Sequence, residues 1–346
     1  MWRVGLYDLV HRRRRFVLAV LATSIAFGLS LLMTGTVQHL KNETTRVVAL
    51  FHADEFVVAA EGTGPFTTTR LVPASVATQL AAQPGVRRAD AFVQARDLLK
   101  GRDVNVLGIV PGGMGDPHVV KGRGLRGPGE AIVDDVLGFR PRARVTLGGR
   151  PTTIVGTSHD TTYYFGQPTV FMPIGDVQAA FLHGLPLAMA VAVRGHVTTP
   201  PSGTQVLTLD AVRRDLNRPQ KSGNQTVAIF NTLLWLMAAG IVATMVYLTA
   251  LERARDIAVF KAMGASNRRL FADMAVQGLA LALTACVVGT AVSIGLAKVM
   301  PFGVETPARG YAELVVVAVV VGLLAALVGV RRAVHIDPAL AFGGQT

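Results

Sequence analysis

The chain has 346 residues, of which 51% are hydrophobic and 16% are charged, and its formal net charge is +12. Its one cysteine, Cys286, excludes an intrachain disulfide, so cysteine usage does not reveal the redox compartment. With so large an apolar fraction, the first question is whether the hydrophobic residues form membrane spans.

Four stretches lack Asp, Glu, Lys and Arg, namely residues 16–40, 222–251, 274–297 and 314–330. A helix of about 20 apolar residues crosses a hydrocarbon core about 30 Å thick, so each stretch is predicted to be a transmembrane helix. The last stretch has only 17 residues, but Tyr311 and Arg331 anchor a short span at its two ends. The alternative of four buried helices in a soluble protein is disfavoured, and residues 16–40 are too long for the apolar part of a signal peptide.

The orientation follows from three basic segments, namely residues 1–15, 252–273 and 331–346. Together they hold twelve bases against five acids, which accounts for about seven of the twelve net charges, so nucleic acid is a poor explanation of the basic balance. The short loop 298–313 on the other side has two bases and two acids. The positive-inside tendency therefore predicts a plasma (inner) membrane protein with both termini in the cytoplasm.

Residues 41–221 form one large insert between the first two spans and are predicted to be an extracytoplasmic α/β (α+β) domain. Runs rich in β-branched residues predict strands at 55–59, 104–110, 152–156, 169–172 and 189–193. Helices are predicted at 73–83 and from Leu209 to Leu216, the second with Thr208 as its N-cap. The insert is long enough for one core or for two small lobes, and the sequence leaves both possibilities open.

Small residues recur four apart in three of the predicted spans. They are Ala22, Ala26, Ser30 and Thr34 in the first span, Ala285, Gly289, Ser293 and Ala297 in the third, and Ala318, Gly322 and Ala326 in the fourth. Such stripes let helices approach closely in lipid, either within one subunit, which we favour, or across a dimer interface. The absence of charged residues in mid-span argues against an ion channel, a proton relay or a polar central pathway.

The inner loop 252–273 is a charged segment between two apolar runs. Residues 256–263 predict a short helix that ends at Gly264, and Ser266 is placed to cap the next membrane helix. Ile257, Phe260 and Met263 recur at three-residue steps and form an apolar ridge with charged flanks. The ridge fits a groove in a cytoplasmic partner, although an amphipathic helix resting on lipid headgroups is the alternative.

This loop carries a family resemblance. The run Glu252-Arg-x-Arg-Asp-Ile-Ala-x-Phe-Lys-Ala-Met-Gly-Ala resembles the hallmark loop of the MacB/FtsX/LolC-LolE superfamily, the type VII or mechanotransmission class of ABC transporter permeases. The ending Arg331-Arg-Ala-Val-His-Ile-Asp-Pro-Ala is similar to that family's basic tail, and residues 1–15 resemble its N-terminal amphipathic helix. Weaker matches in the insert, such as Gly108-Ile-Val-Pro-Gly and Val170-Phe-Met-Pro-Ile, follow the order of a MacB-like periplasmic core domain.

The resemblance implies that the inner loop is a coupling helix that docks on a separate ATPase subunit. The residues it assigns to that docking segment are Glu252, Arg253, Arg255, Asp256, Ile257, Phe260, Lys261, Met263 and Gly264. The resemblance implies that Ile257, Phe260 and Met263 insert into the ATPase as apolar anchors. The basic residues Arg253, Arg255 and Lys261 would orient the contact. The resemblance also implies a dimer of membrane subunits, in which Ala285, Gly289, Ser293, Ala318, Gly322 and Ala326 would serve helix packing or the dimer interface.

The sequence offers little support for catalysis by this chain. It has no Gly-x-x-x-x-Gly-Lys-Ser/Thr loop, so ATP and magnesium are expected on the partner subunit, as in the split, DevC-like members without a fused ATPase. Ser158, His159 and Asp160 are triad residue types, but sequence neighbours project their side chains apart. The histidines show no zinc-binding spacing, and no cofactor or metal is expected.

We therefore expect the permease subunit of an ABC complex that moves its outer domain to export or extract a hydrophobic, lipid-linked or peptide substrate. The alternative is an FtsX-like regulator that switches a cell-wall hydrolase and transports nothing. The expected partners are the ATPase, a second copy of the chain and the bilayer, with a membrane-fusion protein or a hydrolase outside. A membrane-anchored enzyme is the least favoured interpretation.

Overall fold

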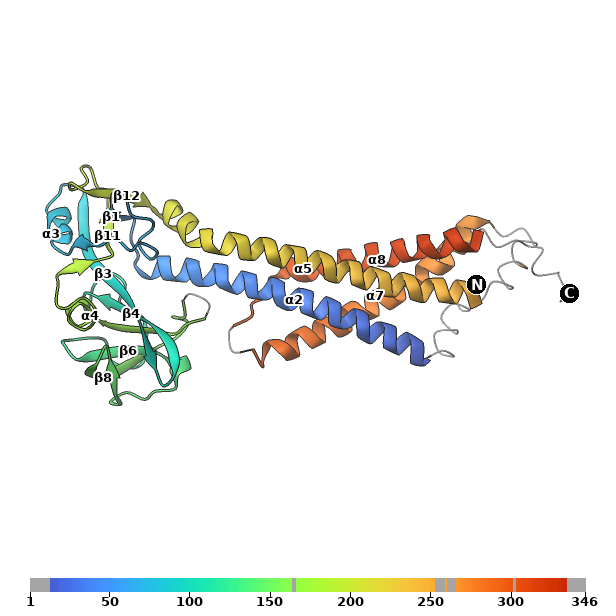
Figure 1. Ribbon diagram of the computed structural model, residues 1–346, viewed down its shortest axis with the longest axis horizontal. Coiled ribbons are helices and arrows are strands. Elements are labelled where there is room, and N and C mark those ends of the chain that lie inside the picture. The colour runs from blue at the N-terminus through green and yellow to red at the C-terminus, as the bar shows by residue number, and fades with distance from the viewer. Residues whose placement is uncertain (1–12, 164–165, 253–258, 260–265, 301–302, 335–346) are drawn as a thin grey trace. The chain divides into compact units, whose positions relative to one another are not determined.

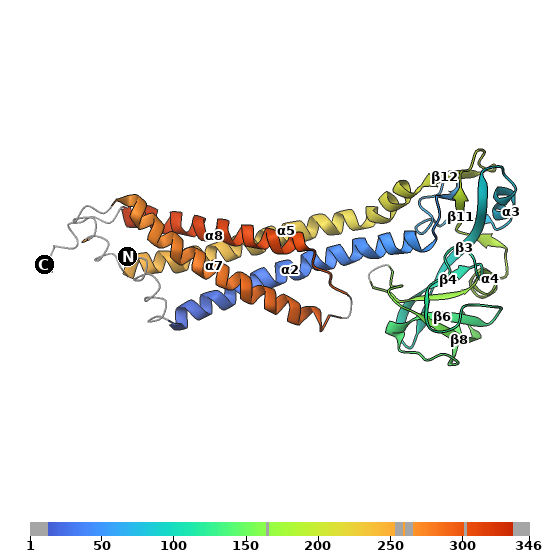
Figure 2. The same ribbon diagram turned by 180° about the vertical axis from the view of Figure 1, so that it is seen from behind.

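The computed structural model describes residues 13–163, 166–252, 259, 266–300 and 303–334. The chain divides into two units (Figures 1 and 2). One unit, the membrane unit, comprises Met1–His39 and Asn224–Thr346, and the other, the outer unit, comprises Leu40–Gly223. The sequence predicts an outer insert at residues 41–221, whereas the outer unit of the structure spans Leu40–Gly223.

The membrane unit is built from long apolar helices. They are α2 (Arg13–Leu50), α5 (Leu209–Glu252), α7 (Asn267–Ala297) and α8 (Ala308–Val334). Within the described part of the chain, four stretches are long and apolar enough to cross a membrane: Arg14–Leu50, Gln225–Glu252, Phe271–Ala297 and Ala308–Gly329. The prediction of four membrane helices around an α/β insert is confirmed.

Two of these helices are longer than the apolar runs predict. Helix α2 continues to Leu50, ten residues beyond the expected end at residue 40, and so enters the outer unit. Helix α5 begins at Leu209, where the backbone N–H of Ala211 donates to Thr208 Oγ1 over 3.4 Å, so the predicted cap is confirmed. The structure joins the two predicted segments, 209–216 and 222–251, into one helix that includes Pro219. Proline inside a helix removes one backbone donor and crowds the carbonyl of the residue four positions earlier, so the continuous helix is a departure from its usual effect.

The core of the membrane unit consists mostly of small and medium side chains. Phe27 and Leu281 are its largest fully buried residues, and alanines such as Ala282 and Ala325 fill the space between helices. Two places bring backbone directly against backbone. A Cβ built on Gly289 would lie 2.7 Å from the carbonyl oxygen of Ser24 on α2, and one built on Gly278 would lie 2.6 Å from that of Gly322 on α8. Helix α7 therefore touches both α2 and α8 at glycines.

The outer unit contains a mixed sheet. Its strands are β1 (Glu55–Ala59), β3 (Val86–Leu99), β4 (Arg102–Ile109), β5 (Val119–Gly122), β6 (Glu130–Asp134), β7 (Arg144–Leu147), β8 (Arg150–Ser158), β9 (Thr169–Pro173), β11 (Ala190–Gly195) and β12 (Thr204–Thr208). Their order is β12-β1-β11-β3-β4-β9-β6-β8-β5, with β7 paired to β8. Only the β4–β9 and β6–β8 pairs are parallel among the pairings described. The five predicted strands correspond to β1, β4, β8, β9 and β11.

Short elements complete the outer unit. They are α3 (Val76–Ala81), the 3-10 turn η1 (Asp135–Leu137), α4 (Ile174–Phe181) and a small ladder of β2 (Val72–Pro73) with β10 (Leu187–Ala188). The predicted helix at 73–83 was too long, because its first residue pairs in β2 and the helix begins only at Val76.

An aromatic cluster lies where the end of α2 meets the sheet. Phe51 packs against Phe92 with ring centroids 4.4 Å apart, and Phe56 and Phe66 complete the group. Phe51, Phe56 and Phe92 are buried to within 1% of full burial. Aromatic pairs of this kind add about 0.5–1.5 kcal/mol beyond their area burial. The α2 residues that enter the outer unit are therefore part of its core.

The glycine contact between α7 and α8 gives the first prediction. Gly278→Ala should destabilise the membrane unit by about 1–3 kcal/mol, because a Cβ at 2.6 Å from a backbone oxygen forces the helices apart. Gly295→Ala, also on α7, has open space around its Cβ and should leave stability unchanged or raise it slightly. Thermal unfolding of both variants in nanodiscs measures the difference, and equal melting temperatures would contradict the close approach.

The ion pair between Arg123 and Glu130 gives the second prediction. Arg123 and the backbone N–H of Arg126 hold the Glu130 carboxylate and lower its pKa from 4.5 to about 2. Because the folded pKa lies below the unfolded one, the stabilisation is complete above pH 4.5 and is lost as the pH falls towards 2. After allowance for solvent screening, Glu130→Gln should lower the free energy of unfolding by about 1 kcal/mol at pH 7 and by less at pH 3. Calorimetry of the full chain at both pH values tests this, with Glu61→Gln, from the exposed pair with Arg70, as the neutral control.

Candidate functional site

The first turn of α2 and the last turn of α5 are joined by a side-chain contact next to the predicted docking loop. Glu252 is the last residue of α5, and its Oε1 accepts from Arg15 Nη1 of α2 over 2.6 Å. The other residues assigned to docking, namely Arg253, Arg255, Asp256, Ile257, Phe260, Lys261, Met263 and Gly264, lie outside the described residues. Ser266 stands at the N-cap position of α7, but its side chain makes no capping hydrogen bond; its carbonyl oxygen accepts from Arg269 instead.

Helices α2 and α5 also make two polar contacts one helical turn apart. Trp235 Nε1 donates to Ser30 Oγ over 2.9 Å, and Asn231 Nδ2 donates to Thr34 Oγ1 over 3.2 Å. In lipid, hydrogen bonds of this kind typically contribute about 0.6 kcal/mol and fix which faces of two helices meet. The sequence identified Ser30 and Thr34 as one face but missed their partners on α5, because Trp and Asn are not small residues.

The predicted small-residue stripes lie in contacts within this chain. Ala285, Ala318 and Ala326 are fully buried, and Ser293 is 4% exposed. Gly289 and Gly322 occupy the two backbone contacts described above. Helix packing inside one subunit therefore accounts for these residues, and their use in a dimer interface remains a prediction.

A shallow apolar groove lies on the surface of the membrane unit. It has a volume of about 540 Å³ and is lined by Ala19, Met237, Gly240, Ile241, Thr244, Met245 and Leu248. Thr244 is the only one of these residues with a polar side chain. Apart from the Thr244 hydroxyl, the groove presents hydrocarbon and no charged group.

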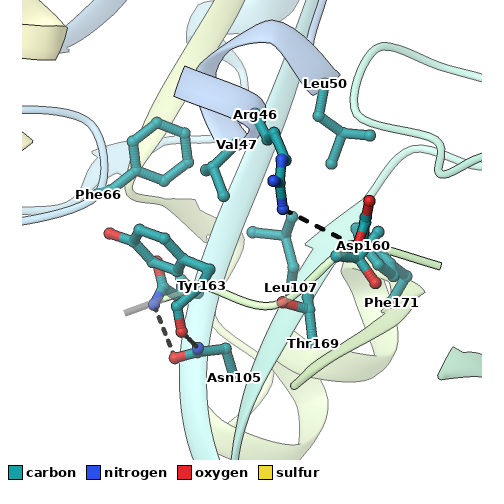
Figure 3. Close-up of a pocket in the computed structure, with 12 residues that line it drawn as sticks. Arg46, Val47, Leu50, Phe66, Asn105, Leu107, Asp160, Tyr163, Thr169 and Phe171 are labelled. Carbon is teal, nitrogen blue, oxygen red and sulfur yellow. Dashed lines mark hydrogen bonds and ion pairs between the residues drawn. The ribbon is translucent and has the colours of Figure 1, made fainter. Parts of the chain in front are cut away.

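A cavity of about 50 Å³ lies within the outer unit, against the last turns of α2 (Figure 3). Its apolar walls come from α2 (Val47 and Leu50), from the sheet (Leu107 and Phe171) and from two loops (Phe66 and Tyr163). At its edge, Arg46 Nη1 lies 3.9 Å from Asp160 Oδ1. Asn105 is 1% exposed and donates from Nδ2 to the carbonyl oxygen of Tyr163 over 2.9 Å, which fixes the loop against β4.

A buried carboxylate ties the same loop to α2. Glu43 is 1% exposed, and it accepts from Thr162 Oγ1 over 2.9 Å and from the backbone N–H of Gly166 over 3.2 Å. Hydrogen bonds to a charged acceptor are worth about 1.5–3 kcal/mol each. One face of α2, from Glu43 to Leu50, therefore holds the loop and forms a wall of the cavity.

The residues of triad type do not form a catalytic group. Ser158 is fully buried, and its Oγ pairs with Thr161 Oγ1 at 2.8 Å rather than with a histidine. His159 Nδ1 lies 2.8 Å from Asp135 Oδ2, and this carboxylate raises the pKa of His159. Asp134 accepts three hydrogen bonds from Val136 and Thr161, and burial raises its pKa. In the described ranges, no group of three or more His, Cys, Asp or Glu could hold a metal ion.

The chain is similar in sequence to known membrane permeases. Residues 228–338 match the family model described as FtsX-like permease C-terminal. The chain is 36% identical over 344 residues to the uncharacterized ABC transporter permease Rv2563 of Mycobacterium tuberculosis (strain ATCC 25618 / H37Rv), covering 98% of this chain and 99% of the relative. It is 35% identical, with the same coverage, to the uncharacterized ABC transporter permease Rv0072 of that strain.

Two solved structures are also similar to part of the chain. The periplasmic region of MacB from Actinobacillus actinomycetemcomitans matches with 11% identity and a TM-score of 0.36, covering 51% of this chain and 98% of that one. The extracellular domain of the transporter YknZ from Gram-positive bacteria matches with 15% identity and a TM-score of 0.34, covering 44% and 98%.

The four membrane helices and the relatives matched over nearly their whole length define an integral inner-membrane permease of an ABC transporter. The chain belongs to the MacB/FtsX family of these permeases.

The contact between Arg15 and Glu252 gives the third prediction. Because the two side chains are 60% and 31% exposed, the pair should contribute no more than about 1 kcal/mol. Arg15→Glu should weaken it, and the double variant with Glu252→Arg should restore it. A double-mutant cycle on thermal stability at low salt measures the coupling, and zero coupling would show that the two helix ends are not joined in solution.

Proposed function

We propose that this chain is the membrane subunit of an ABC complex in which a separate nucleotide-binding subunit hydrolyses ATP and thereby moves the outer unit. The observation that carries the proposal is the 36% identity to an ABC transporter permease over 98% of the chain. ATP and magnesium would be bound by the partner, and two membrane subunits would work with two ATPase subunits. Both termini and the docking loop would lie in the cytoplasm, with the outer unit outside.

The two long helices support a mechanical form of coupling. Residues 40–50 of α2 and 209–223 of α5 belong to the outer unit, while the rest of each helix belongs to the membrane unit. An α-helix is hydrogen-bonded along its whole length, so a displacement at one end is carried along its axis. In this proposal the ATPase acts on the docking loop after α5, and α5 and α2 convey the motion outward.

The surface of the membrane unit supports a hydrophobic substrate. Ile229, Phe230, Leu233 and Leu236 are exposed along α5, and the apolar groove near Met237 offers no charge. A polar solute would have no partners there. Export or extraction of a lipid-linked, peptide or other hydrophobic substrate at the outer leaflet fits this surface, and a membrane-fusion protein is a natural outer partner. If a secreted cell-wall hydrolase bound the outer unit instead, the FtsX-like regulatory function would replace transport.

The docking segment gives the fourth prediction. Phe260→Asp places a charge on the apolar ridge formed with Ile257 and Met263, and it should abolish co-purification of the ATPase subunit without unfolding the membrane unit. Val259→Asp, one residue away and off the ridge, is the matched control and should retain the ATPase. Affinity purification of the tagged permease from cells that express both subunits is the measurement. Unaltered association of the Phe260 variant would refute the docking assignment.

A further inference from the structure

We propose that a basic surface of the outer unit binds an acidic surface of an extracytoplasmic protein. This basic surface consists of Lys100, Arg102, Arg140, Arg142 and Arg144, all of which are exposed. The inference rests on the proposed function, because it names the place where an outer partner would meet the permease and the chemistry of that partner. All five residues belong to the outer unit.

The first argument is that the five cations lie in one region. The three arginines of residues 140–144 occupy alternate positions in the segment that leads into β7. The turn between β3 and β4 packs on the same segment. Lys100 Nζ lies 3.8 Å from the centroid of the Phe139 ring, and Arg102 Nη1 donates to the carbonyl oxygen of Val136 over 3.5 Å. Two segments that are about forty residues apart in sequence therefore combine their basic side chains.

The second argument is that these cations are not neutralised within the chain. In the part of the chain that the structure describes, none of the five makes an ion pair. Segment 136–157 has four arginines and no Asp or Glu. Elsewhere in the outer unit, the usual arrangement is a guanidinium within 3.9 Å of a carboxylate, as at Arg46, Arg70, Arg87, Arg88, Arg123 and Arg213. An anionic partner would therefore meet a positive charge that the chain leaves uncompensated.

The acids closest in sequence do not compensate this charge. Asp103 follows Arg102 in β4, and successive residues of a strand point to opposite faces of the sheet. Asp135 Oδ2 lies 2.8 Å from His159 Nδ1. Asp97 accepts from a backbone N–H of the β7–β8 turn over 2.7 Å. Each of these carboxylates is thus turned away from the basic surface or bonded to another group.

The third argument is the backbone conformation at two of the cations. Lys100 has a φ of 53° and Arg142 a φ of 76°, both in the left-handed region. Glycine adopts this region freely, and Asn and Asp do so more readily than other residues. Turn formation would therefore favour a small residue at either position. The long basic side chains stand there against the local preference, so the turn does not explain their charge.

The backbone beneath the arginines is well held. The N–H of Arg142 donates to the carbonyl oxygen of Ile154 over 2.7 Å, and the N–H of Ile154 donates to that of Ala143 over 2.8 Å. Leu147, at the end of β7, is fully buried. A surface that is already ordered loses little conformational entropy when a folded partner binds.

The composition of the surface favours a protein as the partner. Protein interfaces are enriched in Arg and depleted in Lys, and four of these five cations are arginines. Guanidinium groups bind carboxylates with two parallel hydrogen bonds, so Asp and Glu side chains are suitable ligands. Val136, whose carbonyl oxygen contacts Arg102, is 54% exposed and adds an apolar contact.

Other occupants fit this surface less well. A second copy of the chain, docked through the same surface, would place like charges opposite each other. Surfaces that bind lipid headgroups usually combine bases with exposed Trp, Phe or Leu, whereas Phe139 is half-buried beneath Lys100. An anionic glycan would match the charge but would leave Val136 without an apolar partner.

Site-specific photocrosslinking of the full chain in its host cells tests the proposal. The photoreactive residue p-benzoylphenylalanine replaces Thr146, which is exposed in β7 two residues after Arg144. The matched control replaces Thr198, an exposed threonine beyond the end of β11. Mass spectrometry identifies the crosslinked peptide. We expect a protein to crosslink at position 146 through a segment of net negative charge, with a yield at least about tenfold above that at position 198.

Charge reversal provides the second arm. Arg142→Glu combined with Arg144→Glu should lower the yield at position 146 at least about tenfold, because like charges would then face each other. Arg213→Glu combined with Arg214→Glu makes the same change of charge near the start of α5 and should leave the yield unchanged. Reversal of the acids in the captured segment should restore crosslinking to the Arg142 and Arg144 variant. This rescue separates a lost contact from a misfolded chain.

Several results would overturn the proposal. They are a yield at position 146 no higher than at position 198, capture only of a glycan, a lipid or a second copy of the chain, and capture of a protein through a neutral or basic segment. Equal loss of yield in the two double variants, or failure of the rescue, would do the same. The crosslink is read without ATP hydrolysis, so its failure leaves the permease function untouched, while loss of ATPase docking in the Phe260 variant leaves the basic surface intact.

Discussion

The membrane unit depends on backbone-to-backbone contact at glycines. Lipid tails are as apolar as Leu and Val, so burial of hydrocarbon does little to bring helices together in a bilayer. Close packing and a few polar contacts must do so instead. The close packing occurs where Gly289 lies against Ser24 and where Gly278 lies against Gly322. The polar contacts are the hydrogen bonds from Trp235 and Asn231 of α5 to α2. Helix α7 contacts both α2 and α8 at glycines, while α5 bonds to α2 through side chains and buries Ala238, Val242 and Val246 in the core.

The outer unit uses α2 as part of its own fold. Phe51 directly follows the helix and enters the aromatic cluster, while Glu43 and Arg46 reach the loop around Thr162. The same helical residues therefore stabilise the outer unit and border its cavity.

The elements that are local in sequence could be predicted, and those that depend on distant partners could not. Absence of charge identified the membrane helices, and β-branched runs identified strands such as β1 and β9. The sheet order could not be predicted, because β4 pairs in parallel with β9, more than sixty residues away. The cavity was missed for the same reason: Leu50, Asn105 and Tyr163 are adjacent only in the folded unit. Helix α5 was divided because the charge-free run begins only at residue 222, whereas the helix begins at Leu209.

The central claim is that nucleotide turnover in a partner subunit moves the outer unit of this chain. Double electron–electron resonance tests it most directly, with spin labels at exposed Val299 in the membrane unit and exposed Leu185 in the outer unit, after replacement of Cys286. In the complex with its ATPase, the account predicts a distance distribution that differs between the nucleotide-free and ATP-bound states. Identical distributions, measured while the bound ATPase is turning over, would contradict it.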